Sequence, residues 1–135
     1  MIILTNSTSL TLGPGQSATF DTVRLHTGCS ECHRQGSGSV ALIARNAIYS
    51  IAGGGNIGAT EVGNANLTVF LNGSPMTETS MNSATAAVGD TNNVFRETRV
   101  RTCCRPNVSE NVTLVNNGET TIVLENPILM IGRLA

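Results

Sequence analysis

The sequence contains no Lys and no Trp, and aromatic residues make up only 3% of its 135 residues. All eight basic residues are therefore Arg, and they are spread along the chain without forming a basic stripe. Nucleic-acid-binding domains usually carry such a stripe or patch, so we expect no nucleic-acid partner. The shortage of aromatic rings also means that the core must be built mainly from Val, Ile, Leu, Ala and a few Met residues.

Long apolar runs are also absent. No stretch approaches the roughly 20 apolar residues that a membrane-spanning helix needs, so we expect no membrane partner. The N-terminus lacks a charged segment followed by an apolar one, which is the mark of a secretory signal peptide. Any export is therefore expected through lysis or on a larger particle. The length suits a single domain over residues 1–135.

Short apolar segments separated by turn signals run through the whole chain. Leu67–Leu71 is predicted as a strand, and Asn72-Gly73 with the alternating residues 76–81 predicts a hairpin after it. Asn93–Thr102 is another predicted strand, whereas the small apolar residues 83–88 are typical of either a strand or one short helix. Such segments amount to about eight to ten short strands, which indicates an all-β sandwich or barrel.

Three glycines in a row, Gly53, Gly54 and Gly55, interrupt one of the apolar segments. Consecutive glycines exclude a regular helix and are typical of a β-bulge or a sharp bend in a strand. The longer segment 53–58 is rich enough in glycine to suggest a phosphate-binding loop. It lacks the Lys and the following helix of such loops, so we predict a bend.

The C-terminal segment is apolar almost to its last residue. A strand at residues 111–116 is followed by an Asn-Gly turn, a strand at 120–124 and a long apolar strand at 127–135. An apolar strand must be buried, or it leaves an exposed edge. Leu129 and Ile131 alternate with Met130, so one face of this strand should pack in the core. We predict a closed β-domain that assembles with itself.

Two segments resemble the jelly roll shared by tumour necrosis factor and C1q. Residues 47–74 (AIYSIAGGGNIGATEVGNANLTVFLNGS) contain a Tyr-x-Ile strand and, after a turn, a strand that ends in Asn-Gly. Residues 112–135 close with a Leu-x-Ile-x-Arg-Leu pattern, supplied by Leu129, Ile131, Arg133 and Leu134. The resemblance covers most of residues 40–135 and implies a jelly-roll β-sandwich of antiparallel strands that forms a homotrimer. The chain departs from the family in its few aromatic residues and in a loop rich in Cys and His.

Members of this family occur at the ends of collagen-like spore-surface proteins and as small proteins of phages and prophages. The resemblance implies a non-enzymatic structural protein of a phage virion, assembled in the cytoplasm of the bacterial host. Such a protein would be a trimeric capsid decoration, or the knob of a head fibre or a tail fibre. Two alternatives stay open, namely a receptor- or glycan-binding head module and a trimeric domain of a spore or cell surface. Jelly rolls serve all these roles, so the fold alone does not decide among them.

Cysteine and histidine side chains offer the only clear candidate for metal chemistry. The residues are His26, Cys29, Cys32 and His33 in a predicted loop at 26–38, with Cys103 and Cys104 far along the chain. A Cys-x-x-Cys loop and a second cysteine pair suit a tetrahedral structural zinc site, with the two histidines as alternative ligands. Disulfides between the pairs are the main alternative, and free thiols are the third. Either crosslink would pin the loop to the body of the domain.

The charged residues predict no catalytic site. Asp90 and Glu97 are lone carboxylates without a His nearby in the sequence, so we expect them to be solvated and the protein not to be an enzyme. Arg96, Arg99 and Arg101 lie close together on one predicted strand. We expect them to form cross-strand salt bridges with Glu97 or Glu119, with an anionic partner as the alternative.

Overall fold

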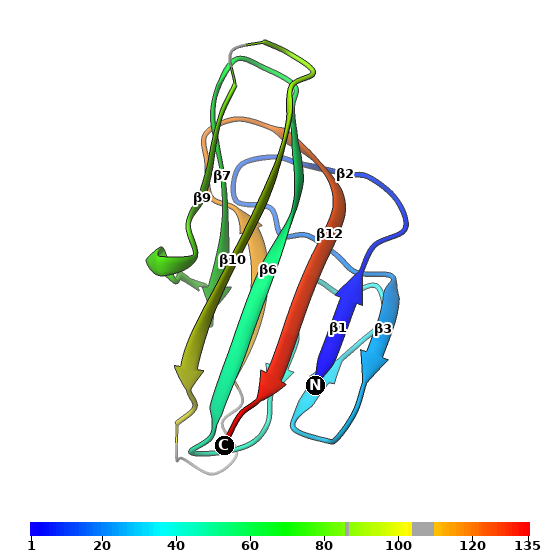
Figure 1. Cartoon of the computed structure of the whole chain (residues 1–135), viewed down its shortest axis with the longest axis vertical. Coiled ribbons are helices and arrows are strands. Elements are labelled where there is room, and N and C mark those ends of the chain that lie inside the picture. Colours follow the sequence, from blue (N-terminus) through cyan, green and yellow to red (C-terminus); the bar gives the residue numbers. More distant parts are fainter. Residues whose placement is uncertain (86, 104–109) are drawn as a thin grey trace.

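The chain folds into two antiparallel β-sheets packed face to face, as an all-β sandwich of the jelly-roll kind (Figure 1). The computed structural model describes residues 1–85, 87–103 and 110–135. The first sheet has the order β10-β6-β12-β1-β3, with β2 also paired to β12. Its strands are β1 (Ile2–Thr5), β2 (Leu10–Leu12), β3 (Thr22–His26), β6 (Ile48–Ala59), β10 (Thr91–Arg101) and β12 (Ile122–Arg133). The all-β, jelly-roll-like sandwich of antiparallel strands predicted from the sequence is therefore confirmed.

The second sheet has the order β4-β5-β11-β7-β8, with β9 also paired to β7. Its strands are β4 (Glu31–His33), β5 (Val40–Leu42), β7 (Gly63–Leu71), β8 (Ser74–Pro75), β9 (Met81–Thr85) and β11 (Glu110–Asn116). The predicted strand at Leu67–Leu71 is confirmed as part of β7. The predicted loop at 26–38 is wrong in part, because residues 31–33 form β4 and pair with β5.

The C-terminal strand β12 lies in the middle of the first sheet, between β6 and the N-terminal strand β1. Ile131 is opposite both Ile2 of β1 and Ile51 of β6. Leu129 and Ile131 are fully buried, as the alternation of apolar residues predicted. Pairing of the two ends of the chain therefore closes the core.

The core between the sheets consists mainly of aliphatic side chains, as the composition predicted. Phe20 and Tyr49 are the only fully buried aromatic residues of the described chain. Around them pack Ile2, Leu4, Leu42, Ile51, Ile57, Leu67, Leu114, Ile122, Leu124 and Leu129, all with less than 2% of their surface exposed.

The glycine triplet does not bend the chain, so this prediction is wrong. Gly53–Gly55 lie inside the continuous strand β6, and the irregularity lies opposite them in β12, between Glu125 and Ile128. The two expected C-terminal strands are consequently one strand with a bulge. A Cβ on Gly53 would lie 3.3 Å from Leu114 Cδ1, and a Cβ on Gly54 would collide with the carbonyl oxygen of Val94. The glycines are thus needed for close packing of strands and sheets.

The hairpin after β7 differs in length from the prediction. Asn72 and Gly73 form its turn with φ angles of 53° and 79°, which suit Asn and Gly. The returning strand β8 has only two residues and is followed by a 3-10 turn, Thr77–Thr79, so the expected strand at 76–81 is wrong. Residues 83–85 continue β9, and residue 86 lies outside the described part of the chain.

Truncation of Leu129 should destabilise the fold strongly, because its side chain is buried between the sheets. We expect Leu129→Ala to lower the free energy of unfolding by about 2–5 kcal/mol, measured by urea denaturation. Leu134→Ala, in a residue that is 54% exposed just beyond β12, is the matched control and should change it little. Equal effects of the two variants would contradict the central position of β12.

Candidate functional site

The outer face of the first sheet carries a groove floored by small side chains. Ser50 and Ala52 of β6 point away from the core, because Ile51 between them is buried in it. Phe95 of β10 lies opposite Gly54, and its side chain is 50% exposed. We call this hollow, of about 410 Å³, the small-residue groove.

Met130 of β12 lines the other side of the small-residue groove, opposite Ala52. Strands with such small outward side chains let another backbone approach closely, as glycines do at tightly packed contacts. Glu97, Arg99 and Arg133 also line the groove, so charged side chains flank its apolar floor.

The arginines of β10 do not form the expected network of salt bridges. Arg99 lies 3.9 Å from Glu97, and both side chains are well exposed, so this ion pair contributes little. Glu119 lies in the β11–β12 turn at the opposite end of β12, so the predicted pairing with it is wrong. Arg101 instead donates from Nε and Nη2 to Asn46 Oδ1, at 3.0 and 2.6 Å.

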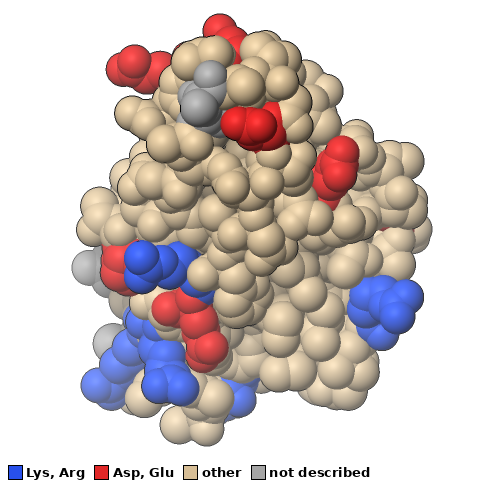
Figure 2. Space-filling model, turned by 45° about the horizontal axis from the view of Figure 1, so that its top comes forward, with Lys and Arg blue, Asp and Glu red and all other residues tan. Residues whose placement is uncertain are grey.

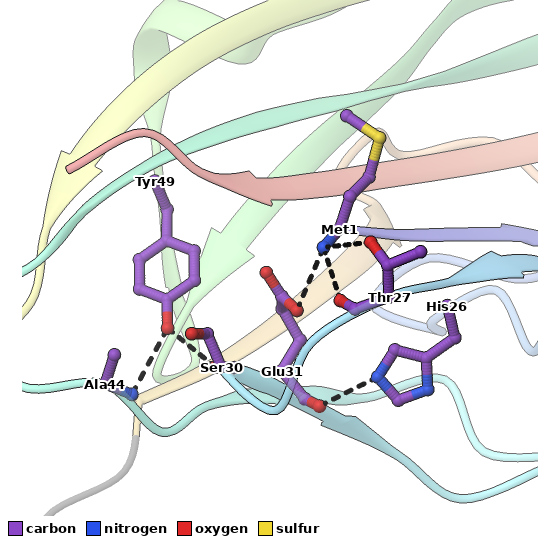
Figure 3. A network of polar contacts seen from close by, with 7 residues as sticks. All are labelled: Met1, His26, Thr27, Ser30, Glu31, Ala44 and Tyr49. Carbon is purple, nitrogen blue, oxygen red and sulfur yellow. Dashed lines mark hydrogen bonds and ion pairs between the residues drawn. The ribbon is translucent and has the colours of Figure 1, made fainter.

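Tyr49 ties the segment that begins at His26 to the body of the sandwich (Figure 3). Its hydroxyl donates to the carbonyl oxygen of Ser30 at 2.6 Å and accepts from the amide of Ala44 at 3.2 Å. Burial raises the pKa of this phenol above its ordinary value of 10.0. The hydroxyl therefore keeps its proton and can donate throughout the physiological pH range.

Glu31 makes a second attachment for the same segment. Its side chain is fully buried, and one carboxylate oxygen lies 3.4 Å from the amino group of Met1. That amino group also donates to the carbonyl oxygen of Thr27 at 2.8 Å, and His26 Nε2 lies 3.2 Å from the carbonyl oxygen of Glu31 (Figure 3). Hydrogen bonds therefore hold residues 26–31 without any help from the cysteines.

The cysteines predicted to bind zinc or to form disulfides are only partly placed. Cys29, Cys32 and Cys103 form no disulfide with one another, the first two are exposed, and Cys104 lies outside the described residues. Within residues 1–85, 87–103 and 110–135, no group of three His, Cys, Asp or Glu residues is close enough to hold a metal. His33 Nδ1 lies 3.1 Å from the carbonyl oxygen of Ser39.

Ser30, next to Cys29, and Cys103 nevertheless contact the same segment, residues 43–46. Ile43 donates its amide to the carbonyl oxygen of Ser30, next to Cys29, and Asn46 donates its amide to the carbonyl oxygen of Cys103. A link between the pairs through Cys29, Cys32, Cys103 and Cys104, by zinc or by disulfides, stays a prediction.

The lone carboxylates form no catalytic arrangement with a histidine in the described part of the chain. Asp90 accepts the amide of Ala87 at 3.2 Å, and Glu97 accepts the hydroxyl of Ser50 at 2.8 Å. His26 and His33 contact carbonyl oxygens instead. These contacts leave the carboxylates as hydrogen-bond acceptors at the surface.

Sequence reasoning missed two features of this region. The sequence indicates Tyr49 only as part of a Tyr-x-Ile strand, because its hydrogen-bond partners are distant in sequence. The small-residue groove is hard to find in the sequence because Ser50 and Ala52 alternate with residues of other kinds, and the glycine triplet suggests a bend. The alternation of small residues at every second position of a strand was the available signal.

Comparison with known proteins gives matches of fold alone. No protein-family model and no curated protein sequence match the chain. Among solved structures, the chain is similar to PRD1 vertex protein P5, a phage protein, with a TM-score of 0.56 and 16% identity over 99% of this chain and 96% of that one. A family 35 carbohydrate-binding module from Clostridium thermocellum matches with a TM-score of 0.46 and 9% identity over 95% of each chain.

No helix long and apolar enough to cross a membrane occurs in the part of the chain that the structure describes.

The likeness to the PRD1 protein extends over nearly the whole of both chains. Together with the two sheets and their strand order, it supports a jelly-roll-like sandwich.

Removing the hydroxyl of Tyr49 should loosen residues 26–31. We expect Tyr49→Phe to lower the free energy of unfolding by about 0.5–1.5 kcal/mol and to speed hydrogen exchange at the amide of Ala44. Because the folded-state pKa is raised, the phenol stabilises the fold fully below about pH 10, and this stabilisation falls as the pH rises through the folded-state pKa. The difference between the two proteins should therefore shrink in alkali. Unchanged exchange at Ala44 would contradict the role of the hydroxyl.

The cysteine prediction is tested by changing Cys29, Cys32, Cys103 and Cys104 together to Ser. A crosslink should make this variant less stable by about 2–4 kcal/mol, and its melting temperature should fall. Zinc near one per chain, with thiols that react only after chelation, identifies a metal site; no metal and no free thiols identify disulfides. Four reactive thiols in the native protein, together with an unchanged melting temperature, would contradict both crosslinks.

Proposed function

We propose that this chain is a non-enzymatic structural protein of a phage particle, where it forms a trimeric knob on the capsid or on a fibre. The observation that carries the proposal is the fold match to PRD1 vertex protein P5, which spans 99% of this chain and 96% of that one. The two proteins share a compact sandwich and little sequence, so the proposal concerns the kind of role and not a common partner.

The proposed trimer is of the tumour necrosis factor and C1q kind. In its support, β12 carries the Leu129–Leu134 pattern of that family and lies at the centre of a sheet whose outer face is free. The small-residue groove on that face exposes Phe95 and half-exposes Met130. A second and a third copy packed there would bury these side chains, and burial of apolar surface drives association.

A non-enzymatic role agrees with the chemistry of the described residues. The exposed carboxylates Asp90 and Glu97 bind an amide and a hydroxyl, and both histidines contact carbonyl oxygens. Another hollow, of about 390 Å³, lies beside the bulge in β12. It is lined by Thr5, Asn6, Arg24, Asn126, Pro127 and Ile128, none of which is a His, Cys, Asp or Glu that could act as a general base.

Light scattering at micromolar concentration tests the trimer. We expect the mass of three chains for the native protein and a smaller mass for Phe95→Asp, because the new carboxylate would be buried without a partner. Val23→Asp, in a residue that is 44% exposed on the edge strand β3, is the control and should leave the trimer intact. A stable monomer or dimer of the native protein would contradict the proposed assembly.

Particle association is tested in the host that produces the protein. Particles purified by density gradient should carry the protein in a fixed ratio to the major capsid protein, as detected by mass spectrometry and by antibody labelling in electron microscopy. If the protein stays in the lysate and is absent from purified particles, the proposal of a virion role is wrong. This result is independent of the trimer, because oligomeric state is measured on the isolated protein.

A further inference from the structure

One end of the sandwich is acidic. The β6–β7, β9–β10 and β11–β12 turns meet at this end, and each supplies one exposed carboxylate, from Glu61, Asp90 and Glu119. None of the three turns contains an Arg. Figure 2 shows red side chains over this end of the molecule, which is uppermost in both views. We call it the acidic end.

The opposite end is basic. Exposed arginines lie in the segment before β6 and at the ends of β10 and β12, namely Arg45, Arg99, Arg101 and Arg133. Figure 2 shows most of the blue side chains gathered toward this end, with red side chains among them. Glu31 is fully buried against an amino group, Glu110 is half-buried, and the exposed Glu97 lies 3.9 Å from Arg99. Arg45 and Arg101 form no ion pair among the described residues, so they carry the free positive charge of this end.

Both ends also expose aliphatic side chains. Val62 and Val88 are 63% and 65% exposed in the turns of the acidic end. Ile43, Ile48 and Leu134 are 48%, 39% and 54% exposed at the basic end. Arg mixed with apolar side chains is typical of protein–protein interfaces. The phosphate backbone of a nucleic acid would offer no apolar surface for the exposed aliphatic side chains to pack against. The basic end therefore suits a protein whose surface is acidic and partly apolar.

We propose that the basic end of one copy binds the acidic end of a second copy, so that copies stack end to end along the strand direction. The acidic end has the chemistry that the basic end requires, namely exposed carboxylates beside exposed valines. Two like ends would repel each other, so charge selects head-to-tail contact. Arg101 is already oriented by Asn46, which lowers the entropy cost of ordering it in a contact.

A head-to-tail contact is heterologous, and it propagates as a stack unless a rotation closes it into a ring. Arg99, Arg133 and Leu134 of the basic end also line the small-residue groove, whereas Arg45 and Arg101 lie outside it. The head-to-tail contact therefore rests on Arg45 and Arg101, which the proposed trimer does not use. The contact is electrostatic and lies at the surface, so it should weaken steeply as salt shortens the range of the charges. A fibre built of such units would follow directly from the geometry of the two ends.

Charge reversal at each end tests the stacking. Glu61→Arg with Glu119→Arg gives a protein with two basic ends, and Arg45→Glu with Arg101→Glu gives a protein with two acidic ends. In sedimentation velocity at about 0.02 M salt, the native protein should form species at least about twofold heavier than at about 0.5 M salt. Neither variant should do so alone, and an equimolar mixture of the two should restore the heavy species, because unlike ends then meet.

Three results would overturn the proposal. These are a native protein whose mass does not respond to salt, a single variant that stacks as the native protein does, and a mixture that fails to stack although both variants are folded. Circular dichroism melts establish folding, and Arg45→Glu alone replaces the acidic-ended variant if loss of the Arg101–Asn46 contact unfolds it. The mass at high salt reports the trimer separately, so failure of stacking and failure of the trimer are distinguished.

Discussion

The pairing of the C-terminal strand β12 with β1 and β6 is the contact on which the rest of the structure depends. It brings Ile131 opposite Ile2 and Ile51, so that the two ends of the chain and its middle share one apolar row. Without β12, the first sheet would divide into separate pairs, and the apolar face of the second sheet would lie open. Long-range pairing of this kind is costly to form, but it leaves no apolar terminal strand unpaired.

The pairing of β12 also determines which side chains lie on the outer face of the first sheet. Because Leu129 and Ile131 face the core, Met130 must face outward and join the small side chains of β6. Because the strands run antiparallel, their turns gather at two ends, and each end receives the charges of its own turns. The small-residue groove therefore adjoins the basic end and shares Arg99, Arg133 and Leu134 with it, whereas the acidic end lies apart from the groove.

Much of this fold was predictable from local patterns. Alternation placed Leu129 and Ile131 in the core, and Asn72-Gly73 located a tight hairpin turn. The continuity of β6 through Gly53–Gly55 was not predictable, because the need for glycine comes from Leu114 and Val94, which belong to distant strands. The attachment of residues 26–31 was missed for a similar reason, since the hydroxyl of Tyr49 reaches Ser30, 19 residues away. The charge of the two ends was not predictable either, because turns that are distant in the sequence supply it.

The central claim is that the outer face of the first sheet is the surface through which copies of this chain associate into the proposed particle knob. A crystal structure or electron-microscopy reconstruction of the assembled protein tests it most directly. The account predicts three copies around one axis, with Ala52, Phe95 and Met130 buried between them. Copies joined through the second sheet, or a groove left open to solvent in the assembly, would contradict it.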